Sequence, residues 1–132
     1  MILYRLEIDG RGLWRATRQV RDACPRSVYH SFLDVRSEMG DRLHSPDSDD
    51  FYNFAGKEMP PSNALFYLTE KGCNMFAEHI TRLKEIFSLT EVKFNVIEKD
   101  LSKLSSYKCW YQDDLQMCIE PIKINQIEVS YV

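Results

Sequence analysis

Residues 2–8 alternate into a segment rich in β-branched and aromatic side chains, and Asp9-Gly10 follows directly. This pattern predicts a half-buried strand that ends in a tight turn. An uninterrupted apolar run at 64–68 predicts a buried strand. The other segments with a strand pattern are 92–98, 107–111, 115–119 and 122–132, and a shift of apolar parity in the last of them suggests a bulge or bend.

Three further segments carry apolar residues at intervals of three or four, which predicts helices. The first is 13–24, which Pro25 stops, and we favour a helix there over a second hairpin strand. Ser27 is a candidate N-cap for a second helix, which Gly40 ends. Thr69 is a candidate N-cap for a third helix, whose apolar face continues to Phe87.

Together these elements predict an α+β fold, in which two to three helices pack on a mostly antiparallel sheet. We expect a single domain over residues 1–132, with residues 13–40 as a candidate helical insertion. Residues 41–63 contain three prolines, four aspartates and no clear periodicity, which predicts a long loop. A loop of this length is unusual unless it has a function or is mobile.

Composition excludes several classes of protein. With 44% hydrophobic residues the chain can form one packed core. No apolar run approaches the roughly 18 residues that cross a bilayer, and the first residues lack the apolar stretch of a signal peptide. We therefore expect a cytoplasmic protein without membrane contact. Residues 1–62 and 63–132 each carry more acidic than basic groups, so non-specific DNA binding is disfavoured.

Arginine is concentrated at the start of the chain, where the first 42 residues hold eight arginines and no lysine although the net charge is −3. Four of them, Arg11, Arg15, Arg18 and Arg21, have the spacing of one helix face. Guanidinium groups in a row suit carboxylates or phosphates bound through two parallel hydrogen bonds. The stripe therefore predicts binding of an anion or of an acidic partner, and the competing interpretation is an ordinary solvated helix face.

A second candidate binding segment lies in the predicted loop. Its acidic residues Asp47, Asp49 and Asp50 precede the aromatic residues Phe51 and Tyr52. The spacing departs from a calcium-binding EF-hand loop, which needs a glycine at its sixth position and a distal glutamate. Acids and aromatics together form recognition loops at protein interfaces. We expect either a solvated acidic loop or a patch that binds a partner.

The sequence lacks the common motifs for catalysis and cofactor binding, including G-x-G-x-x-G, G-x-S-x-G and H-E-x-x-H. Neither the cysteines nor the histidines have the paired spacing of a zinc site. We predict no metal site, no cofactor and reduced, buried thiols, and the function leans away from enzymes. His44, beside acids in the loop, is the best placed histidine for a catalytic base. The cysteines are Cys24, Cys73, Cys109 and Cys118.

The order of elements resembles the ADP-ribosyltransferase fold. The segments that carry the resemblance are Leu3-Tyr4-Arg5, Phe66-Tyr67-Leu68-Thr69 and Glu120-Pro121-Ile122-Lys123-Ile124. The resemblance implies NAD binding through Arg5 and through Tyr67 or Thr69. In that family a glutamate before a late strand acts on the ribose, whereas this chain has Gln116 at the matching place. A glutamine cannot act as a base, which puts transferase activity in doubt.

Other segments together resemble short uncharacterised proteins of bacterial phages and mobile elements, some of which, such as anti-CRISPR inhibitors, bind a host or defence protein. Our leading hypothesis is a small non-enzymatic binding protein of phage type that inhibits a host or defence macromolecule. The alternative is an ADP-ribosyltransferase-like domain, active or degenerate, that binds NAD or another nucleotide. A third hypothesis is a protein that sequesters a cyclic nucleotide or dinucleotide. The segments that carry the resemblance to short phage proteins are Tyr4-Arg5-Leu6-Glu7, Gly10-Arg11-Gly12-Leu13-Trp14-Arg15, His44-Ser45-Pro46 and Leu115-Gln116-Met117.

Overall fold

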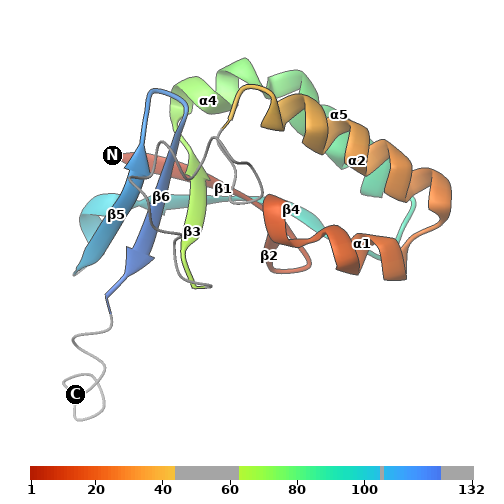
Figure 1. The fold of residues 1–132 in the computed structure, drawn as a ribbon, viewed down its shortest axis with the longest axis horizontal. Helices are drawn as coiled ribbons and strands as arrows, with labels where there is room; N and C mark the ends of the chain where they lie inside the picture. Colours follow the sequence, from red (N-terminus) through yellow and green to blue (C-terminus); the bar gives the residue numbers. More distant parts are fainter. Residues whose placement is uncertain (44–62, 105, 123–132) are drawn as a thin grey trace, which may run out of the picture.

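The computed structural model of the chain describes residues 1–43, 63–104 and 106–122. Within them a curled, six-stranded antiparallel sheet carries helices on one face, which confirms the predicted α+β class (Figure 1). The strands are β1 (Ile2–Ile8), β2 (Arg11–Gly12), β3 (Leu65–Leu68), β4 (Phe94–Asp100), β5 (Tyr107–Gln112) and β6 (Gln116–Pro121). The helices are α1 (Thr17–Ala23), α2 (Arg26–Gly40), α4 (Glu70–Met75) and α5 (Ala77–Phe87), with 3₁₀ turns η1 (Leu13–Arg15) and η2 (Leu101–Lys103).

Strand β1 organises the sheet because it has neighbours on both edges. β4 runs antiparallel to it in unbroken register from Ile2 to Ile8 and so occupies one whole edge. β2 and β3 therefore share the other edge, β2 beside Glu7 and Ile8, and β3 beside Tyr4. β6 continues the sheet beyond β3, and β5 pairs with β6.

The turn between β1 and β2 confirms the Asp9-Gly10 prediction. Both residues have positive φ, 49° at Asp9 and 81° at Gly10, as a two-residue hairpin turn requires. The Asp9 carboxylate also accepts hydrogen bonds from the backbone N–H of Lys93 at 2.8 Å and from the side-chain amide of Gln19 at 3.0 Å. One acidic residue thus connects the hairpin to the segment before β4 and to α1.

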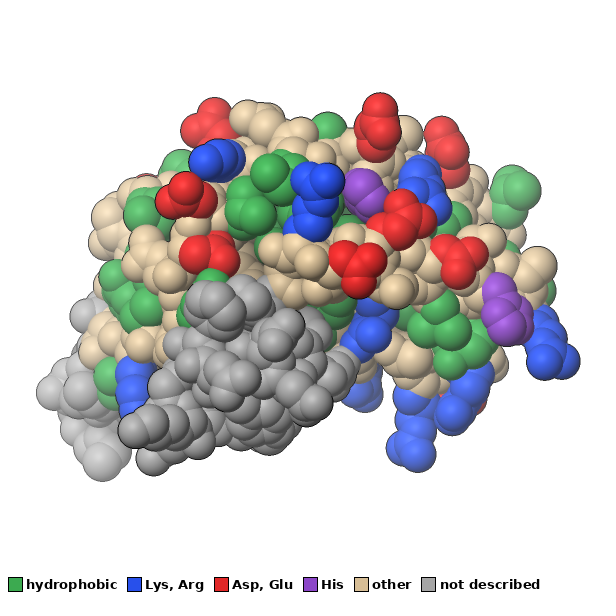
Figure 2. All heavy atoms as spheres, turned by 45° about the horizontal axis from the view of Figure 1, so that its top comes forward, with side chains coloured by type: hydrophobic (Ala, Val, Ile, Leu, Met, Phe, Trp, Pro, Cys, Tyr) green, Lys and Arg blue, Asp and Glu red, His purple; other side chains and the backbone are tan. Residues whose placement is uncertain are grey.

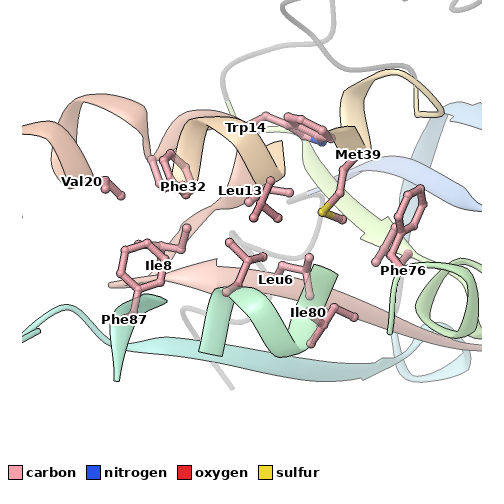
Figure 3. Close-up of a cluster of buried hydrophobic side chains, with 14 of the residues drawn as sticks. Leu6, Ile8, Leu13, Trp14, Val20, Phe32, Met39, Phe76, Ile80 and Phe87 are labelled. Carbon is pink, nitrogen blue, oxygen red and sulfur yellow. The ribbon is translucent and has the colours of Figure 1, made fainter. Parts of the chain in front are cut away.

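The main core lies between the sheet and the helices (Figure 3). Leu6 and Ile8 of β1 point toward the helices, whose apolar residues close over them. Burying each large apolar side chain is worth about 1.5–3 kcal/mol, so this layer is a major stabilising feature of the fold. A smaller cluster on the opposite face contains Leu3, Tyr67 and Leu101. The helical residues of the main core include Val20, Phe32, Met39, Phe76, Ile80 and Phe87.

The predicted helix 13–24 is correct only for its second half. Leu13 and Trp14, both buried, form the 3₁₀ turn η1 instead of the first turn of a helix. The helix α1 begins at Thr17. Residues 13–40 supply a large share of the main core. The predicted insertion therefore packs as an integral part of this fold.

Other boundaries shift by a few residues. Pro25, not Ser27, is the N-cap of α2, because its φ of −56° suits the start of a helix. The predicted third helix divides at Phe76 into α4 and α5. β4 begins two residues later than predicted, at Phe94. The predicted strand 122–132 and most of the predicted loop 41–63 lie outside the described residues.

Helix α4 packs closely against the turn between β5 and β6. As predicted, Thr69 caps it, accepting a hydrogen bond from the Gly72 N–H at 3.1 Å. The Thr69 N–H donates to the Leu115 carbonyl at 2.9 Å. A Cβ atom at Gly72 would lie only 2.2 Å from that same carbonyl oxygen. Position 72 must therefore be glycine for α4 to dock in this place.

We expect Gly72→Ala to lower the free energy of unfolding by about 1–3 kcal/mol, the usual cost of overpacking a rigid contact. The clash is with backbone, so no side-chain movement can relieve it. Thermal denaturation followed by circular dichroism measures the effect. Gly40→Ala is the matched control, because a Cβ at Gly40 meets only the Trp14 ring, at 3.7 Å. Equal stability of the two variants would contradict the proposed contact.

A carboxylate connects α2 to α5. Glu38 accepts two hydrogen bonds from the Arg82 guanidinium, at 2.9 and 3.2 Å, and lies 3.2 Å from His79 Nε2. The hydrogen bonds from Arg82 lower the pKa of Glu38 below its ordinary value, and the contact with His79 lowers it further to a smaller extent. A lowered pKa in the folded state means that the ionised carboxylate stabilises the fold.

We expect Glu38→Gln to reduce the melting temperature at neutral pH, and the difference from the native chain to shrink as the pH falls. The stabilisation is complete above the ordinary glutamate pKa of 4.5 and is lost as the pH drops through the lower folded value. Melting temperatures between about pH 7 and pH 3 test this. The control is Glu85→Gln, at an exposed position of α5, and a constant deficit at all pH values would contradict the linkage.

Candidate functional site

Some of the early arginines serve the fold rather than the surface. Arg15 donates from Nη1 to the Ala64 carbonyl at 3.1 Å, and its guanidinium lies 5.7 Å from the Phe66 ring centre. Arg36 donates from Nη2 to the Trp14 carbonyl at 3.0 Å and lies over the Trp14 ring at 5.2 Å. These contacts fasten η1 to β3 and to α2. Arg15 is therefore not part of an exposed stripe.

The predicted stripe does not form one helix face, because its members belong to different elements. Arg11 lies on β2 and Arg15 on η1, while Arg18 and Arg21 are both exposed on α1. Within the described residues, Arg18 makes no ion pair, and Arg21 pairs only with its neighbour Asp22, at 3.2 Å. An ion pair with side chains 54% and 63% exposed contributes little, so the Arg21 guanidinium remains available.

The exposed arginines continue from α1 onto α2 around a hollow. The helices meet at Cys24-Pro25, and the surface hollow there, about 420 Å³ in volume, is lined by residues from both. Arg26, exposed at the start of α2, donates from Nε to His30 Nε2 at 3.3 Å. We call Arg18, Arg21 and Arg26 the arginine surface. The residues lining the hollow are Arg21, Cys24, Arg26, Tyr29 and His30.

Arginines and acidic residues are unevenly distributed over α1, α2 and α5. Between positions 10 and 33 there are five arginines and one acidic residue, Asp22. The exposed parts of α2 and α5 instead carry Asp34, Glu38, Glu78 and Glu85. Figure 2 shows acidic side chains over the helices in the foreground and basic ones projecting at the lower right, where α1 lies. The arginine surface is thus a local basic region on an acidic protein.

The chemistry of the hollow favours binding over covalent catalysis. Partial burial raises the pKa of Cys24 above its ordinary value, so its thiol stays protonated. His30 accepts the Arg26 hydrogen bond through Nε2, which requires that nitrogen to be unprotonated. The remaining donors of Arg21 and Arg26 suit carboxylate or phosphate oxygens. The loop residues predicted to bind a partner, Asp47, Asp49, Asp50, Phe51 and Tyr52, lie outside the described residues.

The four residues of the predicted nucleotide site do not come together. Directly paired residues of an antiparallel sheet share a face, so Tyr4, Leu68 and Gln116 all point toward the helices. Arg5 and Tyr67 are one position displaced and point to the opposite face. The Gln116 side chain therefore lies on the other face of the sheet from those of Arg5 and Tyr67, although Tyr67 also borders the small cavity beside Gln116.

Their individual surroundings also differ from a nucleotide site. Arg5 is 13% exposed and lies 3.0 Å from the Glu7 carboxylate. The Thr69 hydroxyl is used twice, as the cap of α4 and as a donor to the Asp114 carbonyl at 2.5 Å. Gln116 borders a cavity of about 20 Å³, which is room for one water molecule.

The thiols vary in exposure. Burial raises the pKa of Cys73 to about 11 and that of Cys118 to about 12, as expected of buried thiols. Cys24 and Cys73 are half-buried and Cys109 is exposed, so the prediction of burial is wrong for Cys109, which lies on the edge strand β5. Among the described residues, no three Asp, Glu, His or Cys side chains gather as metal ligands do. None of the described helices combines the length and apolarity needed to span a membrane.

The contribution of Arg26, Tyr29 and His30 was not predicted from the sequence. Pro25 was interpreted only as the end of the predicted helix 13–24. The usable signal was the run Cys24-Pro25-Arg26, because a proline between two helices turns the chain and brings side chains before and after it to one place.

Comparison with known proteins leaves the structure as the main source for a functional hypothesis. No protein-family model, curated protein or solved structure matches the chain. The resemblances to ADP-ribosyltransferases and to short phage proteins thus stay predictions from the sequence. Among the described residues, the arginine surface and its hollow are the candidate site for an acidic ligand.

Proposed function

We propose that this is a small non-enzymatic binding protein that recognises an acidic surface of a partner protein through Arg18, Arg21 and Arg26. The class of the protein, a phage-type inhibitor of a host or defence macromolecule, comes from the sequence resemblance. The single observation that carries the proposal is the arginine surface itself. Arg21 and Arg26 line the hollow, Arg18 lies one turn before Arg21 on α1, and all three are held by few contacts within the described residues.

A protein partner fits this surface better than a nucleic acid does. Binding to a phosphate backbone gains its strength from many neutralised phosphates, and it requires an extended basic surface. Here three arginines are grouped, the chain has a net charge of −3, and exposed acids occupy α2 and α5. A compact acidic patch can meet the arginine surface while avoiding those acids. A long polyanion would lie across both.

The surroundings of the reactive groups support a binding role. The thiols of Cys73 and Cys118 are protonated at neutral pH because burial raises their pKa values to about 11 and about 12. The candidate NAD-binding residues lie on opposite faces of the sheet, as the pairing of β3 with β6 shows for Tyr67 and Gln116. Neither set of residues supplies an assembled site for chemistry.

We expect the double variant Arg18→Glu/Arg21→Glu to bind an acidic partner about five- to thirtyfold more weakly, since reversing two rim charges changes the binding free energy by about 1–2 kcal/mol. The probe is a fluorescent poly-glutamate peptide, titrated by anisotropy at low and at physiological salt. Lys84→Glu/Lys103→Glu is the matched control, because it changes the net charge equally at exposed positions on α5 and η2. Melting temperatures should stay close to that of the native chain in both.

Three results would contradict the proposal. Equal loss of peptide binding in both double variants would show that net charge, rather than this surface, is responsible. Tighter binding to duplex DNA than to the peptide would point to a nucleic-acid partner. Heat released on titration with NAD or a cyclic dinucleotide would favour a nucleotide-binding function. Unlike the two double variants, Arg15→Glu should lower the melting temperature, because Arg15 donates a hydrogen bond to the Ala64 carbonyl.

A further inference from the structure

The outer edge of β4 is an open strand edge. β4 pairs with β1 over seven residues in unbroken register, and no other described strand pairs with it. It contains neither proline nor glycine. The strand at the other end of the sheet, β5, is different, because an irregularity between Cys109 and Tyr111 breaks its register. A long, regular edge of this kind is a template for a further strand.

The hydrogen bonds of β1 show which groups of β4 face outward. Leu101 N–H donates to the Met1 carbonyl at 2.9 Å, and Asp9 N–H donates to the Lys93 carbonyl at 2.8 Å. Because bonded pairs alternate in an antiparallel ladder, the odd-numbered residues of β4 direct their backbone groups toward β1. The backbone groups of the even-numbered residues Val96 and Glu98 therefore point to the open edge.

We propose that this edge pairs with the β4 of a second copy, antiparallel, around a two-fold axis at Ile97. In this register Val96 lies opposite Glu98 of the other copy, and both have outward-facing backbone groups. Phe94 lies opposite Asp100 in the same way. All seven residues of each strand are then paired, and the two sheets become one continuous sheet.

Charge selects this register over its neighbours. An axis at Val96 would place Lys99 directly opposite Lys93 of the other copy, twice. An axis at Glu98 would place that carboxylate opposite itself. With the axis at Ile97, Lys99 faces Asn95, and no two like charges lie directly opposite. Like charges in that position destabilise a strand pair, so charge favours the register with the axis at Ile97 over both of its neighbours, and this register also pairs all seven residues of β4.

Ile97 also explains why a second copy is the preferred occupant. Its side chain is 41% exposed, in a strand whose other exposed side chains, Asn95 and Glu98, are polar or charged. At the axis it would meet Ile97 of the other copy. The two Ile97 residues form a non-hydrogen-bonded pair, in which the side chains approach most closely and the Cα atoms lie about 4.5 Å apart. Pairing would remove both from water.

The first test is the oligomeric state. Sedimentation velocity at about 10 and about 300 µM should show a concentration-dependent dimer of the native chain. Ile97→Lys should weaken it at least about tenfold, because two lysines would meet at the axis. Ile2→Lys is the matched control: Ile2 is 42% exposed but lies on β1, so this variant should dimerise as the native chain does.

The second test fixes the register. Ile97→Cys should form an intermolecular disulfide under mild oxidation, since the Cα separation at the axis falls within the range of disulfides. Asn95→Cys should not, because its own counterpart is four residues away along the other strand. Both variants carry Cys109→Ser, which removes the exposed native thiol, and mass spectrometry of linked peptides identifies the bond. A monomer at all concentrations, equal cross-linking of both variants or an undiminished Ile97→Lys dimer would overturn the proposal.

Discussion

The fold depends on β1 pairing along both of its edges. One edge is filled by β4 over the whole strand, so β2 and β3 have to share the other. Beyond β3 the sheet continues with β6 and then β5. Met117 and Ile119 of β6 join Leu3 of β1 in the second core. The helices cover the opposite face. The same arrangement leaves β4 as a terminal strand of the sheet, so the central position of β1 determines both what the protein buries and which edge it exposes.

The alternation of side chains along β1 and β3 also determines which residues can act together. Neighbouring positions on a strand point to opposite faces, so the side chains of Tyr67 and Leu68 pack in different clusters, however close they are in the sequence. Tyr67 joins the small cluster around Leu3, whereas Leu68 joins the main core. A nucleotide site inferred from the order of elements alone does not include this constraint. Gln116 shows the consequence, because its pairing with Leu68 places it in the interior.

Features governed by local chemistry could be predicted from the sequence. The Asp9-Gly10 turn and the Thr69 cap depend on backbone conformation and nearby side chains, and both occur where expected. The single helix at 13–24 was wrong, because residues 13–15 form η1, which is held by long-range contacts with Ala64 and Arg36 that helical periodicity does not reveal. The hollow could not be predicted either, since it depends on how α1 and α2 meet at Pro25. Long-range geometry, rather than propensity, places the candidate site.

The arginines of the first 42 residues fall into two groups, those that support the fold and those that remain exposed on the surface. Arg15 and Arg36 are held against backbone carbonyls and aromatic rings, so their charges support η1 rather than a surface field. The exposed arginines Arg18, Arg21 and Arg26 therefore lie on α1 and at the start of α2, while the outer parts of α2 and α5 carry exposed acids together with the exposed Lys84. At physiological salt such fields extend about 8 Å, so they act only when a partner is close. An acidic surface is attracted to α1, whereas α5 carries two acidic and two basic residues and offers no net attraction. Electrostatics on this molecule therefore selects the orientation of a partner more than it sets the strength of binding.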